Sequence, residues 1–350
     1  MRFGPVPLAE AEGGILAHSV ALSSGRLRKG RVLDAEDLAQ LRAAGHETLI
    51  VARLDATDIH EDAAALALAQ ALVPDPVAAR LALRAVGTGR VNVIATGPGL
   101  VRLDAARIHA LNQIDSAITV ATLPDLMRVE AGAMLATVKI IPYGVGHGAV
   151  QAACGAGAGE DGTGALRLLP PVIRRASLIQ TFVDSAETGA KGHAVTAARL
   201  AVLGVGLDPL CLVPHDGGAL ASALVQAEGE VILILTGSAT SDVYDTAPQA
   251  LRAAGGELVH FGMPVDPGNL LFLGRLGARM VIGLPGCAKS PALNGADWVM
   301  ERIICGLEVT PGTIMSMGVG GLLTEIPTRP RPRRQGEAAG STGWTKPKVA

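Results

Sequence analysis

The segment Ile232–Asp245 combines groups that bind ligands with the elements that would hold them. Four apolar residues with β propensity run into a Thr-Gly turn, small hydroxyl residues, two acids and the start of a helix. The end of a strand and the positive end of a helix direct N–H groups to one point, so an anion can be held there without a lysine. The residues that would serve it are small or carry hydroxyl groups: Gly237, Ser238, Ala239, Thr240 and Ser241.

The two acids of this segment, Asp242 and Asp245, would act against an anion. Carboxylates repel a phosphate unless a hard cation such as magnesium lies between, or unless one of them accepts hydrogen bonds from a ring nitrogen of the ligand. A structural alternative is that Asp245 caps the helix beginning near Thr246. Both interpretations are open at this point.

The composition is that of an Ala-rich α/β protein. The 350 residues allow two or three domains; 49% are hydrophobic, only 2% are aromatic, and Gly and Pro number 44 and 21. A net charge of −2 gives no electrostatic footprint for nucleic acid or an anionic membrane. No apolar run approaches the roughly 18 residues that cross a bilayer, and the N-terminus lacks signal-peptide features. We therefore expect a cytoplasmic protein without nucleic-acid or membrane partners. Its four separated cysteines should be reduced, partly buried thiols, without a zinc site.

The elements that must position the segment alternate regularly after residue 170. Strands are predicted at 177–182, 209–213, 230–235 and 257–261, with a hairpin at 270–273 and 279–283 joined by 274–277. Helices are predicted at 193–203, 217–226, 246–254 and 291–304. This order predicts an α/β domain over 170–308, in which an open, mostly parallel sheet is covered on both faces and forms three αβα layers. Residues 309–350 are expected to be a C-terminal extension with a disordered tail.

Residues 1–165 are predicted to form a mixed α+β region. Helices are expected at 34–45, 61–73, 76–85 and 104–114, and strands at 47–54, 91–96, 99–103, 117–122 and 134–143. His60, Glu61 and Asp62 are more typical of a helix cap than of a metal site. Lys139 interrupts an apolar strand, so it should face solvent at a sheet edge or reach a ligand. Eight glycines in 144–164 indicate a mobile linker or lid.

Five landmarks of the last domain resemble, in order and spacing, the molybdopterin-binding domain of molybdenum-cofactor biosynthesis proteins. They are Leu235–Asp245, the helix that ends Ala254-Gly-Gly-Glu, Met263–Gly268, Leu273–Gly277, and Ile282–Gly286 with Ser290 beyond it. The resemblance covers 170–308 well and 60–170 only loosely. The N-terminal stretch is weakly similar to the start of the molybdopterin molybdotransferase.

The resemblance implies a role for each matching residue. Loop residues that would lie under the pterin and its phosphate are Thr236, Gly237, Ser238, Thr240 and Ser241. Asp245 matches the acid thought to act with magnesium in adenylate cleavage and molybdate insertion, and Asp242 is the second acid, displaced by one position. The loop that closes the other side matches Leu284, Pro285 and Gly286, with Ser290 at its helix start. Pro267 and Gly268 match the Pro-Gly-Lys-Pro motif, but its lysine is absent from this sequence.

Two functions follow from the resemblance. The first is a protein that binds molybdopterin or the finished molybdenum cofactor for a molybdenum-cofactor nucleotidyltransferase or a recipient molybdoenzyme. The second is an active molybdotransferase-type enzyme that cleaves adenylylated molybdopterin and inserts molybdenum with magnesium. The lost lysine and the shifted acid favour binding, and a homodimer is expected in either case. A sugar-phosphate or nucleotide enzyme on a generic α/β sheet is the alternative outside the family.

Overall fold

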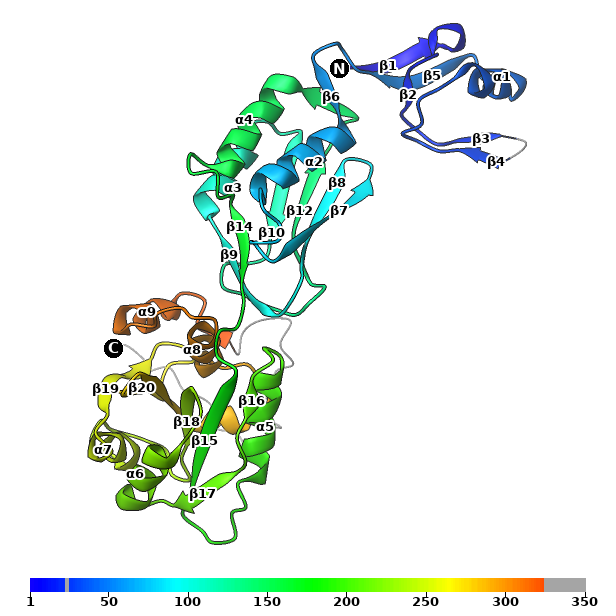
Figure 1. Cartoon of the computed structure of the whole chain (residues 1–350). Coiled ribbons are helices and arrows are strands. Elements are labelled where there is room, and N and C mark those ends of the chain that lie inside the picture. Colours follow the sequence, from blue (N-terminus) through cyan, green and yellow to red (C-terminus); the bar gives the residue numbers. More distant parts are fainter. Residues whose placement is uncertain (23–24, 324–350) are drawn as a thin grey trace, which may run out of the picture. The chain divides into compact units, whose positions relative to one another are not determined.

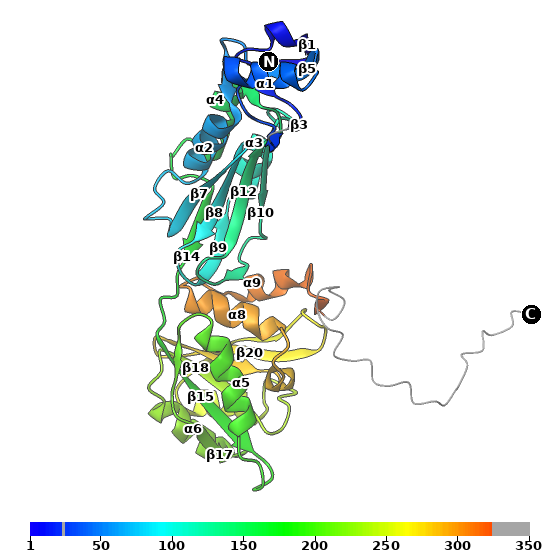
Figure 2. The same cartoon turned by 90° about the vertical axis from the view of Figure 1, so that its right-hand side faces the viewer.

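The chain divides into two compact units, Met1–Pro170 and a second unit that begins at Pro171. A computed structural model describes residues 1–22 and 25–323 (Figures 1 and 2). The predicted C-terminal tail therefore lies, from residue 324 onward, outside the described residues. No helix in the described ranges is long and apolar enough to cross a membrane.

The first unit begins with a small antiparallel sheet in the order β1-β5-β2. Its strands are β1 (Arg2–Pro7), β2 (Ile15–Leu16) and β5 (Thr48–Arg53), and a hairpin of β3 (Val20–Leu22) and β4 (Gly25–Leu27) follows β2. Helix α1 (Ala35–Ala43) starts at Asp34, whose carboxylate accepts a hydrogen bond from the backbone N–H of Asp37. The buried core of this N-terminal part includes Leu16, Leu41 and Val51. Arg31 meets helix α1, because its Nε lies 2.6 Å from a carboxylate oxygen of Asp37.

The rest of the first unit is built on a four-stranded antiparallel sheet in the order β10-β12-β8-β7. The strands are β7 (Leu81–Gly87), β8 (Arg90–Ala95), β10 (Ile118–Thr122) and β12 (Met134–Ile140). Smaller sheets join β6 (Asp58–His60) to β13 (Gly144–Gly146), and β9 (Gly99–Leu103) to β11 (Arg128–Val129) and β14 (Leu166–Leu169). Three helices share its apolar core: α2 (Glu61–Leu72), α3 (Ala105–Asn112) and α4 (His147–Ala158).

The predicted helix at 76–85 is wrong. The Asp75 carboxylate accepts hydrogen bonds from the N–H groups of Val77 and Ala78, which forms a turn that ends at Arg80 with φ of 55°. From Leu81 the chain continues as β7, an edge strand paired with β8. Local side-chain bonding and strand pairing therefore override the helix propensity of an Ala- and Leu-rich sequence.

The glycine-rich stretch is also not a linker, because α4 occupies most of it. A Cβ at Gly157 would lie 3.1 Å from Leu111 and 3.3 Å from Leu72, so glycine allows α4 to pack closely on α3 and α2. The prediction of a sheet edge at Lys139 is wrong as well. Strand β12 is an inner strand, and the Lys139 ammonium pairs at 3.2 Å with the buried Glu61. His60 caps α2, accepting a hydrogen bond from the N–H of Asp62.

The second unit contains a mostly parallel sheet with β15 (Arg175–Phe182) in its parallel part. On one side β15 pairs with β16 (Gly206–Leu207) and β17 (Cys211–Pro214), and on the other with β18 (Val231–Leu235), always in parallel. Strand β21 (Arg279–Leu284) continues the parallel set next to β18. Strands β20 (Asn269–Leu276) and β19 (Glu257–Met263) follow as antiparallel neighbours, so only β20 runs against the others.

Helices lie on both sides of this sheet (Figures 1 and 2). Helices α6 (Gly217–Gln226) and α7 (Thr246–Ala253) share a core with Ile179 and Ile234. Helix α5 (Ala190–Ala201) lies against the opposite face, since a Cβ at Gly192 would meet Gln180 and Leu235, the next residues along those strands. The unit is completed by η2 (Gly286–Lys289), α8 (Gly295–Ile304) and α9 (Pro311–Met315). The predicted hairpin is present, but its strands continue through Gly274 to a turn at Gly277 and Ala278.

Candidate functional site

Three loops meet at the carboxyl ends of neighbouring parallel strands in the second unit. Residues 183–189 follow β15, residues 236–245 follow β18, and residues 285–290 follow β21. The registers bring Gln180, Leu235 and Leu284 to the same edge of the sheet. After β15 the chain continues to β16 and β17, which lie on one side of β15 in the sheet. After β18 it continues to β19, which lies on the opposite side of β18. The chain connections therefore diverge between β15 and β18. Ligands of open α/β sheets bind outside the strand ends at such a divergence.

The 236–245 loop is held by its own carboxylates. Asp245 Oδ2 accepts a hydrogen bond from the N–H of Ser241 at 2.9 Å, and Oδ1 accepts one from Thr246 at 2.6 Å. The N–H of Ser241 is the main cause that lowers the pKa of Asp245, with smaller contributions from Thr246 and His215 and an opposing effect of burial. Asp242 accepts a hydrogen bond from the N–H of Tyr244 at 2.8 Å. Asp245 is thus the N-cap of α7, the structural alternative that the sequence left open.

The small residue Gly237 is explained by the neighbouring strand. Its N–H donates to Thr181 Oγ1 at 2.9 Å, and a Cβ there would lie 2.7 Å from the carbonyl oxygen of Thr181. Thr181 Oγ1 is also 2.8 Å from Nδ1 of His215, at the end of β17. A hydrogen-bonded chain therefore links the ends of β17, β15 and β18.

The site does not provide a ready-made metal cage. Both oxygens of Asp245 already accept backbone N–H bonds, and Asp242 is used in its own turn. Among the described residues, no group of three or more His, Cys, Asp and Glu side chains is arranged to hold a metal ion. Magnesium at Asp245 stays a prediction from the resemblance.

A cavity of about 230 Å³ opens at the same edge of the sheet, on the side of α5. Its lining residues come from three strands, the α5 start and η2: Gln180, Thr181, Glu187, Thr188, Gly189, Lys191, Gly192, Leu212, Leu235 and Lys289. Within the described chain, the ammonium groups of Lys191 and Lys289 have no ion-pair partner, and Glu187 is the one carboxylate in the lining. The lining therefore has a net positive charge.

The start of α5 adds to this positive field. No side chain caps it, whereas Asp216 caps α6 and Asp245 caps α7. Its N-cap residue, Gly189, has φ of 67° and is held by the buried Gln180, whose Nε2 donates to the Gly189 carbonyl at 2.9 Å. Free N–H groups at the start of a helix and the helix dipole favour an anion. The α5 start, rather than the α7 start, therefore offers an anion the open N–H groups.

None of the predicted site residues lines this cavity. Thr236 and Ser290 are the chain neighbours of the lining residues Leu235 and Lys289. Thr236, Thr240 and Leu284 are buried, as is Pro285, whereas Ser238, Ser241, Asp242 and Gly286 are exposed or partly exposed. Pro267 and Gly268 lie in the β19–β20 turn, where Asp266 is bonded to Gly321 and Leu323. That turn is thus fastened by the C-terminal extension.

The sequence reasoning missed Lys191, Lys289 and His215. Lys191 lay outside the predicted helix, which was placed three residues too late because α5 has no Ser, Asp or Asn cap. The signal that could have found it is Thr188-Gly189 with a lysine two residues further on, since glycine at a helix start leaves N–H groups open. Lys289 stands one residue before the predicted Ser290, within the landmark loop.

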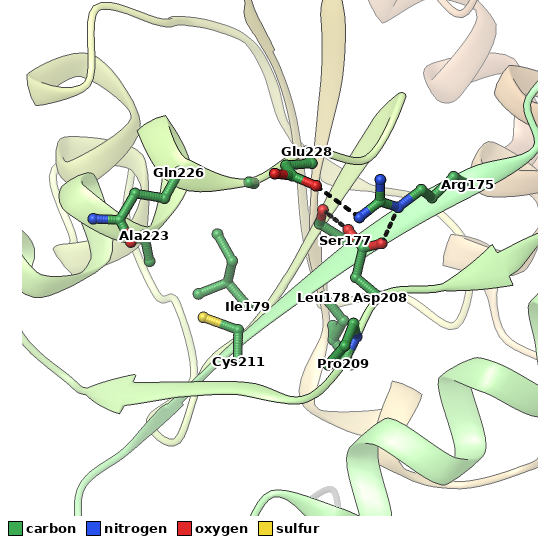
Figure 3. A pocket seen from close by; sticks show the side chains of 11 residues that line it. Arg175, Ser177, Leu178, Ile179, Asp208, Pro209, Cys211, Ala223, Gln226 and Glu228 are labelled. Atoms are coloured by element: carbon green, nitrogen blue, oxygen red, sulfur yellow. Dashed lines mark hydrogen bonds and ion pairs between the residues drawn. The ribbon is translucent and has the colours of Figure 1, made fainter.

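A second cavity, also of about 230 Å³, lies toward the amino end of β15 (Figure 3). It opens beside the interruption between β16 and β17, next to the end of α6. Here the polar groups satisfy one another: Ser177 Oγ donates to Asp208 and accepts from the N–H of Gly229, and Arg175 pairs with Asp208 and Glu228. The Cys211 thiol also lines it, and burial raises the pKa of that thiol.

In the comparison with known proteins, one family model matches a segment near the N-terminus. Residues 5–53 match a domain of unknown function, DUF8806. No curated protein sequence matches the chain. Among solved structures, CinA from Thermoplasma acidophilum, a protein with unknown function, is 16% identical with a TM-score of 0.29. It covers 38% of this chain and 98% of its own. MogA is 20% identical with a TM-score of 0.27, covering 37% of this chain and 92% of its own.

Proposed function

We propose that the second unit binds a small anionic molecule at the carboxyl edge of its parallel strands. The observation that carries the proposal is that two ammonium groups, Lys191 and Lys289, have no ion-pair partner among residues 1–22 and 25–323 and lie beside the uncapped start of α5. Two cations and open backbone N–H groups suit a phosphate or diphosphate group, since charge-assisted hydrogen bonds are stronger than neutral ones. These lysines supply the charge that the Pro267-Gly268 motif lacks.

The proposed ligand is molybdopterin or the finished molybdenum cofactor. The five sequence landmarks support this choice, and with them we propose a three-layer αβα arrangement of the molybdopterin-binding type. The phosphate would lie near Lys191 and Lys289, and the loop 236–245 would line the ring side. The role of Thr236, Gly237, Ser238, Thr240, Ser241 and the 284–290 loop in holding the ligand is part of this proposal.

Binding and delivery are favoured over catalysis. Asp245 uses both carboxylate oxygens to shape its loop and cap α7, so a catalytic role would require giving up bonds that form the loop. We therefore propose a carrier that serves a molybdenum-cofactor nucleotidyltransferase or a recipient molybdoenzyme. The molybdotransferase alternative predicts magnesium-dependent cleavage of adenylylated molybdopterin by the wild type. If the wild type cleaves the adenylate robustly and Asp245→Asn binds pterin normally but does not cleave it, the carrier proposal is wrong and the molybdotransferase alternative is supported.

The test is to purify the full chain from cells that make the cofactor and to oxidise any bound pterin to its fluorescent form. We expect a stoichiometric phosphorylated pterin from the wild type and little from the double variant Lys191→Met, Lys289→Met. Lys29→Met, in the first unit, is the matched control and should retain the pterin. A wild-type preparation without any pterin, from cells shown to contain it, would overturn the proposed ligand.

We also propose a homodimer. Light scattering at micromolar concentration should return twice the chain mass of 35.6 kDa. A mass equal to that of one chain would contradict the dimer without affecting the ligand proposal.

A further inference from the structure

Arg199, in the last turn of α5, donates hydrogen bonds to three backbone carbonyls of the chain that follows β21. Its side chain is only 10% exposed. Nη1 donates to the Ala288 carbonyl at 2.7 Å, and Nη2 donates to the carbonyls of Ser290 and, at 3.0 Å, Ala292. Hydrogen bonds within the loop close short turns, such as the bond from the N–H of Ala288 to the Pro285 carbonyl. The guanidinium thus ties this loop to α5 through three hydrogen bonds.

The anchored carbonyls belong to the residues on either side of Lys289. Because Ala288 and Ser290 are both bonded to one rigid, planar group, the Lys289 backbone between them has little freedom. The Lys289 side chain therefore extends from a fixed backbone position at the cavity. Arg199 itself does not line the cavity. It therefore acts on a ligand through Lys289 and not by contact.

The charge of Arg199 is already compensated inside the protein. Its Nε lies 2.7 Å from Oδ1 of Asp297, which is 4% exposed. The other oxygen of Asp297 accepts a hydrogen bond from the N–H of Asn294, the N-cap of α8. One buried ion pair thus joins the end of α5, the loop and the start of α8.

We propose that Arg199 is a positioning residue that presets Lys289 for the anionic ligand. The inference rests on the proposed anion site. It predicts that the loop is ordered before any ligand binds, so that little conformational entropy is lost on binding.

The test is a double-mutant cycle on the full chain with inorganic pyrophosphate as the probe and Kd measured by calorimetry. Arg199→Lys keeps the charge beside Asp297 but loses the planar set of guanidinium N–H donors, and it should weaken binding about tenfold. Lys289→Met should weaken binding to the same extent. If Arg199 acts through Lys289, the double variant binds no more weakly than Lys289→Met. In the matched double variant Arg199→Lys, Lys191→Met, the two effects on Kd should multiply, so that pyrophosphate binds about a hundredfold more weakly. Multiplied effects for Arg199 and Lys289, or normal binding by Arg199→Lys, would overturn the inference.

Hydrogen exchange separates this inference from the proposed function. In the free wild type, the backbone amides of Ala288 and Ser290 should be protected from hydrogen exchange. In Arg199→Lys, the same amides should exchange about tenfold faster. Exchange at the rate of an open coil in the free wild type would overturn the preset loop, and needs no variant to fold. Protected amides in a wild type that fails to bind pyrophosphate would refute the anion site while leaving Arg199 as the anchor of the loop.

Discussion

The two cavities along β15 have the same volume and opposite arrangements of charge. In the cavity near the amino end of the strand, Arg175, Asp208 and Glu228 pair with one another. In the cavity at the carboxyl end, Lys191 and Lys289 have no such partners in the described chain. Size therefore does not identify the ligand site. The difference indicates that a paired network stabilises the fold, whereas unpaired charge beside an uncapped helix is available to a ligand.

The sharpest way to break this comparison is to remove the unpaired charges. Lys191→Met with Lys289→Met should weaken pyrophosphate binding at least a hundredfold, because each charge-assisted bond contributes about 1.5–3 kcal/mol. Calorimetry on the full chain measures it. Lys29→Met is the control and should bind normally. Unchanged binding by the double variant would show that the two cavities do not differ in function.

The paired network should affect stability and not binding. Ser177→Ala leaves the buried N–H of Gly229 without its acceptor, and should lower the free energy of unfolding by about 1–3 kcal/mol. Urea denaturation measures it, with Ser222→Ala as the control, since that hydroxyl bonds only a carbonyl of its own helix. Pyrophosphate affinity should not change. A loss of affinity in Ser177→Ala would mean that the cavities are coupled.

Asp245 should make a smaller, pH-dependent contribution. Its pKa in the folded protein lies below the ordinary value of 3.8, chiefly because of the Ser241 N–H. Its stabilisation is therefore fully present above that ordinary value and is lost as pH falls through the lower folded pKa. At pH 7, Asp245→Asn should lower stability by less than about 1 kcal/mol, because asparagine is also a good cap. Urea curves of wild type and variant should converge in acid; a constant gap would contradict the assignment.

The smallest difference concerns thiols next to the two cavities. Burial raises the pKa of Cys211, which reduces its thiolate fraction, whereas Cys287 is exposed beside the lysine cavity. Iodoacetamide at pH 8 should therefore modify Cys287 several-fold faster, as followed by peptide mass spectrometry. Equal rates of modification in the folded protein would show that the reagent reaches Cys211 in the cavity near the amino end of β15.

Except for the two-residue β16, the strands of the second unit's sheet were predictable from sequence, because they are apolar runs bounded by clear turns. Helix α6 follows Asp216 and α7 follows Asp245, and both caps are local signals. The first unit was harder. The segment 76–85 has helix propensity but pairs with β8, and the glycines of α4 matter only because Leu72 and Leu111 lie against them. Neither contact is visible in a local pattern.

The proposed anion site lies at the edge of the sheet that the sequence indicated, but at the start of α5 and not at the start of α7. The sequence placed the anion by α7, where the structure has the Asp245 carboxylate. It could not show that Lys191 and Lys289, nearly a hundred positions apart, line one cavity. That approach depends on Gly192, whose lack of a side chain lets α5 lie against Gln180 and Leu235.

The reversed strand β20 has a consequence for the order of folding. It pairs with its chain neighbours β19 and β21 through short turns, so this meander closes small loops. Strand β15 instead pairs with β17 and β18 only after whole helices have intervened. Local pairings form sooner than distant ones. The meander should therefore appear first during refolding, and pulse-labelled amides of β20 should gain protection ahead of those of β15, with the lysine cavity assembled last.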